Sequence, residues 1–405
     1  MKSERRFEPV TVNKKAERGI RSGHPWVYGA ELVRGVPEDF ENGGLVDVLT
    51  ENGKYLGTGL YSAVSKIAVR LLSDNANERF DEAFWQRRVK YAVNYRRRVM
   101  GPDFDACRLI FGEADGFPGL TVDRYGDYLV AEVLSYGMDR VKTTVFRALL
   151  TELPGIKGIY ERNESQIRLL EGLEQGSGWA EGLPNDGQTS TIITENGLRF
   201  LVDFAGGQKT GFFLDQKYNR RAVAKLAPGM RVLDMCTHTG SFALNAARQG
   251  TDLVTAVDVS EAALEVARTN AALNGLEDKV DFVRGDVFDY LAEAEKLPPA
   301  QRYELIILDP PAFTKSSKTL GNARNGYSEI NARAMRALGR GGYLATCSCS
   351  HFMTTELFLD MLKTAAEDAG VRLKIAEIRH QAPDHPVLLG VPESDYLKFV
   401  ICQIV

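Results

Sequence analysis

Two short segments of the chain carry residue types that could act on a nucleobase. The first, DPPAF at positions 309–313, follows an apolar run, and its two prolines stiffen it because neither continues a strand freely. Asp309 could hydrogen-bond the Watson–Crick edge of a flipped-out base, and Phe313 could stack on that base. This segment therefore indicates chemistry on a planar nitrogen heterocycle.

The second segment contains Cys347 and Cys349 at the end of a later apolar run. Carbon 5 of a pyrimidine is a poor nucleophile, but a thiolate that adds to carbon 6 makes the ring enamine-like, which is covalent catalysis. Two buried structural cysteines would explain the same residues equally well. No second Cys or His pair has zinc-site spacing, so Cys349 and His351 alone predict no metal site.

The stretch at 231–258 has the pattern of a mononucleotide-binding βαβ unit. One strand ends on Asp234, a turn contains Thr239 and Gly240, and a second strand ends on Asp258. A single glycine serves a pyrophosphate poorly, whereas S-adenosylmethionine (SAM) makes no such demand. Asp234 could take the ammonium of SAM, Gly240 could approach its tail, and Asp258 its ribose hydroxyls. An ordinary βα turn would also fit the pattern.

Asp286 ends the next strand, where a carboxylate could accept a hydrogen bond from an adenine amino group. A helix N-cap is the alternative explanation for this residue. From about residue 198 onward, strands and helices alternate, which predicts a doubly wound, mostly parallel sheet with ligands at the carboxyl ends of its strands. The candidate residues fall at such ends: Asp234, Asp258, Asp286, Asp309 and Cys349.

The length and composition limit the number of domains, the partners and the cellular location that we expect. The chain has 405 residues, which predicts two or three domains, and its net charge of −4 counts only weakly against RNA binding. Five scattered cysteines suit a reduced cytosol. The start resembles no signal peptide and no apolar run spans a membrane, so we expect a cytoplasmic protein without membrane contact.

The first 74 residues are predicted to form short strands, with Asn52-Gly53 as a hairpin turn. Small β-barrels of this kind often bind RNA, and the basic residues Lys14, Arg18 and Arg21 would suit phosphates. A solvated basic loop explains them equally well. We expect a helical linker at 75–104, a small α+β domain at 105–196 and a SAM-binding domain at 197–405.

Several ordered motifs resemble one family over essentially the whole chain: HPWVY, RLIFGEADGFPGLTVDRYGD, KTGFFLDQKYNR, VLDMCTHTGSF, LDPPAF, SCS and QAPDHPVLLGVPESDYLK. The family comprises bacterial 23S rRNA cytosine-C5 methyltransferases with an N-terminal PUA domain. The resemblance implies an α/β protein in which a PUA β-barrel and a small α+β domain precede a Rossmann-type class I methyltransferase domain. It also implies SAM as cofactor and 23S rRNA as partner.

The resemblance also implies roles for individual residues. Cys349 matches the nucleophile of the SCS motif, Asp309 matches the carboxylate that holds the cytosine edge, and Gln216 matches a position near the cofactor. Cys347 is a second thiol where the family more often has another residue. A related branch shares the DPP-aromatic loop but methylates guanine nitrogens without a cysteine, and a non-catalytic RNA- or SAM-binding module is an alternative of another class. Members of families like the one that this chain resembles are often homodimers, so a homodimer is a possible assembly.

Overall fold

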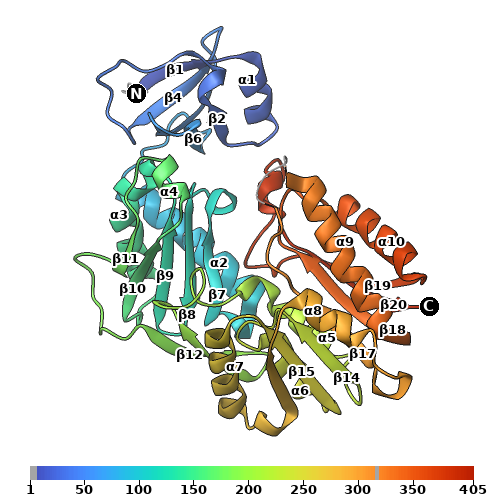
Figure 1. Cartoon of the computed structure of the whole chain (residues 1–405). Coiled ribbons are helices and arrows are strands. Elements are labelled where there is room, and N and C mark those ends of the chain that lie inside the picture. Colours follow the sequence, from blue (N-terminus) through green and yellow to red (C-terminus); the bar gives the residue numbers. More distant parts are fainter. Residues whose placement is uncertain (1–6, 315–318) are drawn as a thin grey trace. The chain divides into compact units, whose positions relative to one another are not determined.

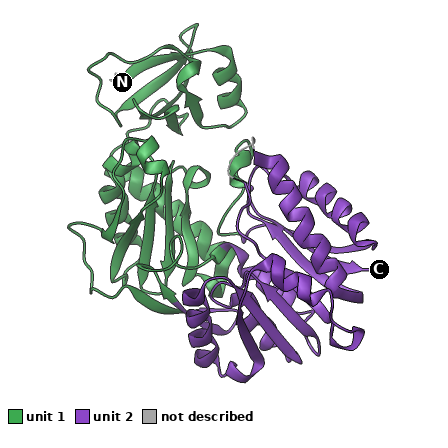
Figure 2. Cartoon of the chain, in the orientation of Figure 1, with its two compact units in different colours: residues 1–193, 202–214, 383–394 green, residues 194–201, 215–382, 395–405 purple. Residues whose placement is uncertain are grey.

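The computed structural model describes residues 7–314 and 319–405. The chain divides into two compact units, shown in different colours in Figure 2. The first unit comprises residues 1–193, 202–214 and 383–394, and the second comprises 194–201, 215–382 and 395–405. Residues 1–6 of the predicted N-terminal domain lie outside the described residues. No helix in the described ranges is long and apolar enough to cross a membrane.

The N-terminal sheet of the first unit has six strands in the order β2-β6-β5-β4-β1-β3 (Figure 1). β1 pairs with β4 in parallel, and the other neighbours are antiparallel. Asn52 and Gly53 lie in the turn between β4 and β5, as predicted, and Gly53 has a φ of 74°. The strands are β1 (Glu8–Val12), β2 (Trp26–Tyr28), β3 (Leu32–Arg34), β4 (Leu45–Thr50), β5 (Tyr55–Tyr61) and β6 (Ile67–Ser73).

A helix, α1 (Lys14–Arg21), occupies part of this region where only strands were predicted. The side chain of Asn13 accepts hydrogen bonds from the backbone N–H groups of Lys15 and Ala16 at 3.0 and 3.1 Å. These bonds satisfy two of the donors that a helix start leaves unpaired. The prediction was wrong here because this cap and the burial of Ala16 in the core of the sheet outweigh the short apolar runs.

The second sheet of the first unit has five strands in the order β11-β10-β9-β8-β7. β9 and β10 are parallel, and the other pairs are antiparallel. This sheet and its helices form the small α+β fold expected for the middle of the chain. Its elements are α2 (Glu82–Met100), β7 (Ala106–Phe111), β8 (Leu120–Tyr125), β9 (Tyr128–Val133), α3 (Tyr136–Glu152), β10 (Gly158–Asn163), α4 (Ile167–Leu170) and β11 (Gly176–Trp179).

The helix α2 is packed into this fold, whereas the sequence predicted a linker at 75–104. It contacts α3 and β7, and it buries Phe84 and Val89. Arg96 is fully buried, pairs with Asp115 at 2.5 Å and donates a hydrogen bond to the carbonyl oxygen of Asp384 at 2.8 Å. A buried arginine with fixed partners ties a helix to its surroundings, so α2 belongs to the core of the first unit.

Two later segments, 202–214 and 383–394, return to the first unit, so the predicted domain at 197–405 is not continuous. In the second of these segments, the Asp384 carboxylate accepts the backbone N–H of Arg108 at 2.9 Å, and Glu393 lies 3.6 Å from His24. The strands β12 (Ser190–Glu195) and β13 (Leu198–Asp203) form a two-stranded sheet where the chain passes from one unit to the other.

The second unit is built on a seven-stranded sheet in the order β16-β15-β14-β17-β18-β20-β19 (Figure 1). Its strands are β14 (Arg231–Met235), β15 (Leu253–Asp258), β16 (Val280–Arg284), β17 (Tyr303–Leu308), β18 (Leu338–Ser348), β19 (Leu373–Arg379) and β20 (Lys398–Ile404). Its helices are α5 (Lys217–Ala224), α6 (Ser241–Ala247), α7 (Glu261–Asn274), α8 (Val287–Ala294), α9 (Leu320–Ala337) and α10 (Thr355–Ala369).

The first five strands of this order are parallel, and β20 is antiparallel to both of its neighbours. Helices separate the parallel strands along the chain, which is the doubly wound Rossmann-type arrangement predicted from the alternation. α9 packs between α8 and α10, and α5 packs on α6. The fold class predicted from the sequence is therefore confirmed.

Candidate active site

The residues expected to do chemistry follow neighbouring strands of the sheet in the second unit. β14, β17 and β18 lie side by side, with Met235 opposite Leu308 and Leu308 opposite Thr346. Asp309 follows β17, and Cys349 comes directly after β18. Because these strands are parallel, their carboxyl ends meet at one edge of the sheet, where ligands bind in open α/β folds.

The turn after β14 holds three residues in the left-handed region: Cys236, His238 and Gly240, with φ angles of 61°, 52° and 79°. Non-glycine residues at positive φ are uncommon and cluster at ligand-binding turns. A Cβ on Gly240 would lie 3.1 Å from the Cβ of Ala267 on α7. Gly240 is therefore required by its conformation and by helix packing, whereas the sequence analysis assigned it to close approach of the ligand.

Asp234 is completely buried at the end of β14. Its Oδ2 accepts the hydroxyl of Thr237 at 2.5 Å and the backbone N–H of Ala243 at 2.9 Å. Its Oδ1 is buried without a hydrogen-bond partner among the described residues. Burial raises the pKa of Asp234 to about 7. A buried acceptor that lacks a partner fits a cationic ligand group, such as the ammonium of SAM.

The two neighbouring acidic residues also organise backbone. Asp258 accepts the N–H of His238 at 2.8 Å and of Ser260 at 2.9 Å, and it thereby holds the turn against β15. Asp286 is exposed and caps α8 by accepting the N–H of Phe288 at 2.8 Å, so it is a helix N-cap in this structure. Thr239 is buried, and its carbonyl oxygen accepts the side-chain amide of Asn270 at 3.0 Å.

Gln216, Asp309 and Cys347 form a cluster of hydrogen bonds. The Cys347 thiol donates to Oδ1 of Asp309 at 2.9 Å. Nε2 of Gln216 lies 3.3 Å from the same oxygen and 3.5 Å from the Cys347 sulfur. Cys347 is fully buried, and burial together with the Asp309 carboxylate raises the pKa of its thiol well above the ordinary value. Cys347 is therefore a protonated donor at neutral pH.

Cys349 lies in a different environment from Cys347. β18 ends at Ser348, and the Cys349 side chain beyond it is partly exposed. Because the strand ends between them, the alternation of side chains along a strand does not place the two thiols on one face. Ser350 fixes the following turn, because its hydroxyl donates to the carbonyl oxygen of Thr314 at 3.1 Å.

Phe313 packs on Tyr327 of α9, with ring centroids 4.5 Å apart. Its backbone N–H also donates to the Tyr327 hydroxyl at 3.5 Å. The side chain of Phe313 remains partly exposed, so one of its faces is committed to the protein. The sequence predicts base stacking by Phe313, whereas its contact with Tyr327 has no signal in the sequence.

Lys398, the first residue of β20, was not singled out in the sequence. It pairs in register with Ser348, and its ammonium donates to the carbonyl oxygens of Ser350 and Tyr396. It is only 2% exposed, and burial lowers its pKa to about 8, whereas the charges of Asp395, Cys349 and Cys347 act in the opposite direction. Lysine is rarely buried unless it is paired, so its position directly before the apolar run at 399–402 was the signal that the sequence offered.

The predicted RNA-binding cations Lys14, Arg18 and Arg21 lie on α1 in the first unit. Lys14 and Arg21 both pair with Glu17, at 2.9 and 3.1 Å. Arg18 donates to the backbone carbonyl of Lys14 at 3.3 Å. The positive charge of α1 is thus partly neutralised within the helix. The side chains of these residues are solvated, which the sequence analysis had left open.

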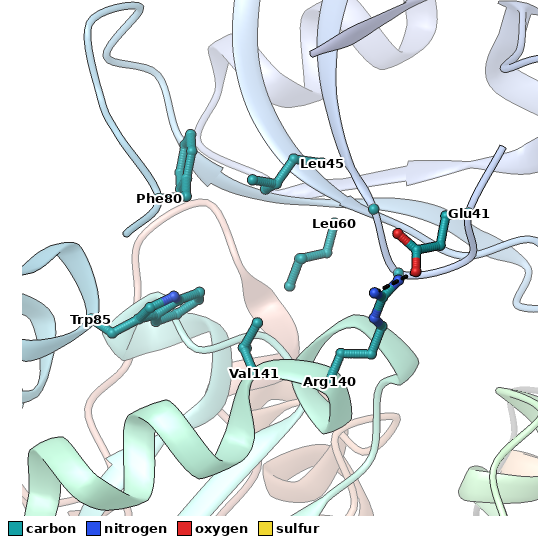
Figure 3. Close-up of a pocket in the computed structure, with 9 residues that line it drawn as sticks. Glu41, Leu45, Leu60, Phe80, Trp85, Arg140 and Val141 are labelled. Atoms are coloured by element: carbon teal, nitrogen blue, oxygen red, sulfur yellow. Dashed lines mark hydrogen bonds and ion pairs between the residues drawn. The ribbon is translucent and has the colours of Figure 1, made fainter. Parts of the chain in front are cut away.

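The first unit also contains a cavity of about 250 Å³, whose lining is drawn in Figure 3. Phe80 and Trp85 are its aromatic lining residues, and Arg140 forms an ion pair with Glu41 in the lining at 2.6 Å. None of the residues predicted to act in catalysis or in cofactor binding line this cavity.

Family models match two parts of the chain. Residues 171–393 match an S-adenosylmethionine-dependent methyltransferase, and residues 10–74 match a PUA-like domain. The Rossmann-type sheet and these matches define the class of protein, which is a SAM-dependent methyltransferase with an N-terminal PUA-like domain. SAM is therefore its cofactor.

Curated relatives narrow this class. The ribosomal RNA large subunit methyltransferase I of Klebsiella pneumoniae (strain 342) is 38% identical over 401 residues, which cover 98% of each chain. The protein of the same name from Aeromonas hydrophila is 40% identical over 402 residues, covering 97% of this chain and 98% of that protein. The chain belongs to the family of these methyltransferases.

Solved structures share the fold over nearly the whole chain. A Streptococcus mutans protein described as a SAM-dependent methyltransferase aligns with a TM-score of 0.82 at 21% identity, covering 98% of this chain and all (100%) of that chain. A methyltransferase structure complexed with SAH aligns with a TM-score of 0.83 over the same shares, also at 21% identity. At this identity the similarity establishes the fold alone.

Proposed function

We propose that this protein methylates carbon 5 of a cytosine in the RNA of the large ribosomal subunit, through a transient bond between Cys349 and carbon 6 of the base. The observation that carries the proposal is the position of Asp309 and Cys349, each directly after one of two adjacent parallel strands, β17 and β18. One residue can hold the base edge while the other attacks the ring. A guanine N-methyltransferase needs no such thiol.

The substrate class is supported by the relatives and by the first domain. The relatives named above are ribosomal RNA large subunit methyltransferases over almost their full length. The PUA-like match supports RNA binding by the N-terminal domain, in which we assign Lys14, Arg18 and Arg21 to phosphate contacts. Their partial neutralisation by Glu17 predicts that they contribute modestly and in a salt-dependent way.

Two residues, Cys349 and Asp309, have assigned roles in the proposed reaction. The Cys349 thiolate forms a bond to carbon 6, and the electron pair of the ring double bond makes carbon 5 nucleophilic. When bound, SAM would supply the methyl group as an electrophile and would leave as S-adenosylhomocysteine. A base then removes the proton from carbon 5, and the bond between Cys349 and carbon 6 breaks, so that the ring double bond is restored. Asp309 holds the Watson–Crick edge throughout.

The choice of Cys349 over Cys347 as the nucleophile follows from their surroundings. Only a thiolate attacks, and a thiolate at Cys347 would be buried beside the Asp309 carboxylate. Cys349 is partly exposed and next to Ser350, whose carbonyl oxygen accepts a hydrogen bond from the Lys398 ammonium. A nearby cation lowers the pKa of a thiol, so we assign Lys398 to support of the Cys349 thiolate.

The cofactor is assigned to the strand ends on the other side of β17. Asp234 would take the ammonium, because its Oδ1 is a buried acceptor without a partner in the described chain. Asp258 would take the ribose hydroxyls, and Asp286 the adenine amino group. The backbone around Thr239 and Gly240 would contact the tail of SAM. Gln216 would act indirectly, by holding Asp309 through a hydrogen bond.

The proposal is tested by identifying the methylated nucleoside. Purified protein, labelled SAM and unmodified 23S rRNA are incubated, and the RNA is digested to nucleosides. We expect label in 5-methylcytidine with wild type, a loss of more than about a thousandfold with Cys349→Ala, and unchanged SAM binding by that variant. Label in a methylguanosine that survives Cys349→Ala would assign the protein to the nitrogen-methylating branch instead.

A further inference from the structure

The proposed reaction leaves one thiol without a task, although this thiol touches the residue that holds the base. The Cys347 thiol donates to Oδ1 of Asp309 at 2.9 Å, and Gln216 donates to the same oxygen at 3.3 Å. Two donors fill both lone pairs of this oxygen. Oδ2 of Asp309 makes no hydrogen bond with the described residues.

The donor atom of Gln216 is fixed by further hydrogen bonds. Its Oε1 accepts the side-chain amide of Asn219 at 2.7 Å, which turns Nε2 toward Asp309 and Cys347. Asn219 is held in turn by Arg379, whose Nε donates to its Oδ1 at 2.9 Å. A side chain fixed in this way offers one orientation, so the cluster is preorganised for a single arrangement of Asp309.

This arrangement determines where Asp309 can carry a proton. An oxygen that accepts both an S–H and an N–H has both of its lone pairs engaged, so any proton that Asp309 takes up goes to Oδ2. Burial raises the pKa of Asp309, and the Asp215 carboxylate does so too, whereas Cys347, Arg220 and Gln216 oppose the shift. Oδ2 is then the oxygen through which Asp309 can contact the base.

We infer that Cys347 is a positioning residue: with Gln216 it holds Oδ1 of Asp309, so that Oδ2 faces the Watson–Crick edge of the cytosine. The inference rests on the proposed function. A base edge that is held in one orientation keeps carbon 6 within reach of Cys349.

The test compares Cys347→Ser, which keeps a hydrogen-bond donor, with Cys347→Ala and Cys347→Val, which do not. Cys402→Ala is the matched control, because Cys402 is also a fully buried thiol of this sheet but lies outside the cluster. Single-turnover methyl transfer to unmodified 23S rRNA and the SAM dissociation constant are measured for each. Formation of a stable adduct with 23S rRNA transcribed with 5-fluorocytidine is measured in parallel.

We expect Cys347→Ser and Cys402→Ala to transfer methyl groups within about threefold of wild type, and Cys347→Ala and Cys347→Val to be about thirtyfold slower with unchanged SAM affinity. Wild-type rates in the Ala and Val variants, or an equal loss in the Ser variant, would overturn the inference alone. If wild type forms no adduct with the fluorinated RNA, the proposed function fails, and the inference fails with it.

Discussion

The hydroxyl of Ser348 donates a hydrogen bond to the hydroxyl of Tyr327 over 3.1 Å, which joins the end of β18 to α9. Tyr327 also contacts Phe313 through its ring and accepts the N–H of that residue. One buried side chain therefore holds both the thiol-bearing strand end and the DPPAF segment. The two parts of the candidate active site are positioned by a residue that need not touch the substrate.

Tyr327→Phe should therefore slow methyl transfer about tenfold while lowering the free energy of unfolding by only about 1 kcal/mol, because the ring stays and the hydrogen bonds are lost. Tyr343→Phe is the control. Tyr343 lies on β18, away from the carboxyl end of this strand, and its hydroxyl accepts a hydrogen bond from Gln403 at 3.3 Å. Kinetics and denaturant titration measure the two effects. Equal rate losses in both variants would contradict this role for Tyr327.

Lys398→Met should slow alkylation of Cys349 by iodoacetamide about tenfold at pH 7, because loss of the cation raises the pKa of the thiol. Lys398→Arg should retain most of the rate. Since burial lowers the pKa of Lys398 to about 8, its charge is present below that pH and lost above it. The difference between wild type and Lys398→Met should therefore shrink above pH 8. Peptide-resolved mass spectrometry measures it, and a rate that is independent of the substitution would exclude this role.

Asp234 should make SAM binding pH-dependent. Its pKa of about 7 in the folded protein means that a growing fraction is ionised as the pH rises toward 7.5, and an ionised carboxylate attracts the ammonium. We expect SAM affinity to increase about tenfold between pH 5.5 and 7.5, and Asp234→Asn to abolish this trend. Calorimetry at several pH values measures the SAM affinity of both proteins. If the affinity of Asp234→Asn depends on pH as strongly as that of wild type, Asp234 does not bind the ammonium of SAM.

The same residue should affect stability in the absence of SAM. Its folded-state pKa lies above the value of about 3.9 expected for an unfolded chain, so the folded protein binds more protons between about pH 4 and pH 7. Stability should fall across this window as the pH rises, by up to about 4 kcal/mol for this group. Asp234→Asn should flatten the fall, and a steeper fall in the variant would contradict the assigned cause.

Gly240→Ala should destabilise the protein by about 1–3 kcal/mol and weaken SAM binding, because it combines a positive φ with a close contact at Ala267. Gly250→Ala is a matched control, since Gly250 has a φ of 84° but a Cβ there would meet nothing within 4 Å. Thermal unfolding measures the loss of stability, and calorimetry measures the loss of SAM affinity. Identical losses in both variants would show that packing on α7 contributes nothing.

The sequence predicted the parts of the site that local patterns encode. Strands that end on Asp234, Asp258 and just before Asp309 could be read from short apolar runs, and alternation with helices predicted their common edge. The helix α1 was missed because its start depends on one capping residue, Asn13, rather than on hydrophobic periodicity. The N-terminal sheet around it was predicted correctly as short strands.

Contacts between distant parts of the chain could not be predicted in this way. The hydrogen bond from Cys347 to Asp309 and the placement of Lys398 beside Ser350 depend on strand register and strand order. The return of residues 383–394 to the first unit has no local signal either. The resemblance to a family implies Cys349 as the nucleophile, and the surroundings of Cys347 give a physical reason to propose it.

The central claim is that Cys349 forms a covalent bond to the substrate, and trapping that bond tests it most directly. Wild type, Cys349→Ala and Cys347→Ser are incubated with SAM and 23S rRNA transcribed with 5-fluorocytidine, and the linked peptide is sequenced by mass spectrometry. We expect a nucleotide attached to Cys349 in wild type and Cys347→Ser, and none in Cys349→Ala. A nucleotide attached to Cys347, or methylated RNA without any adduct, would contradict it.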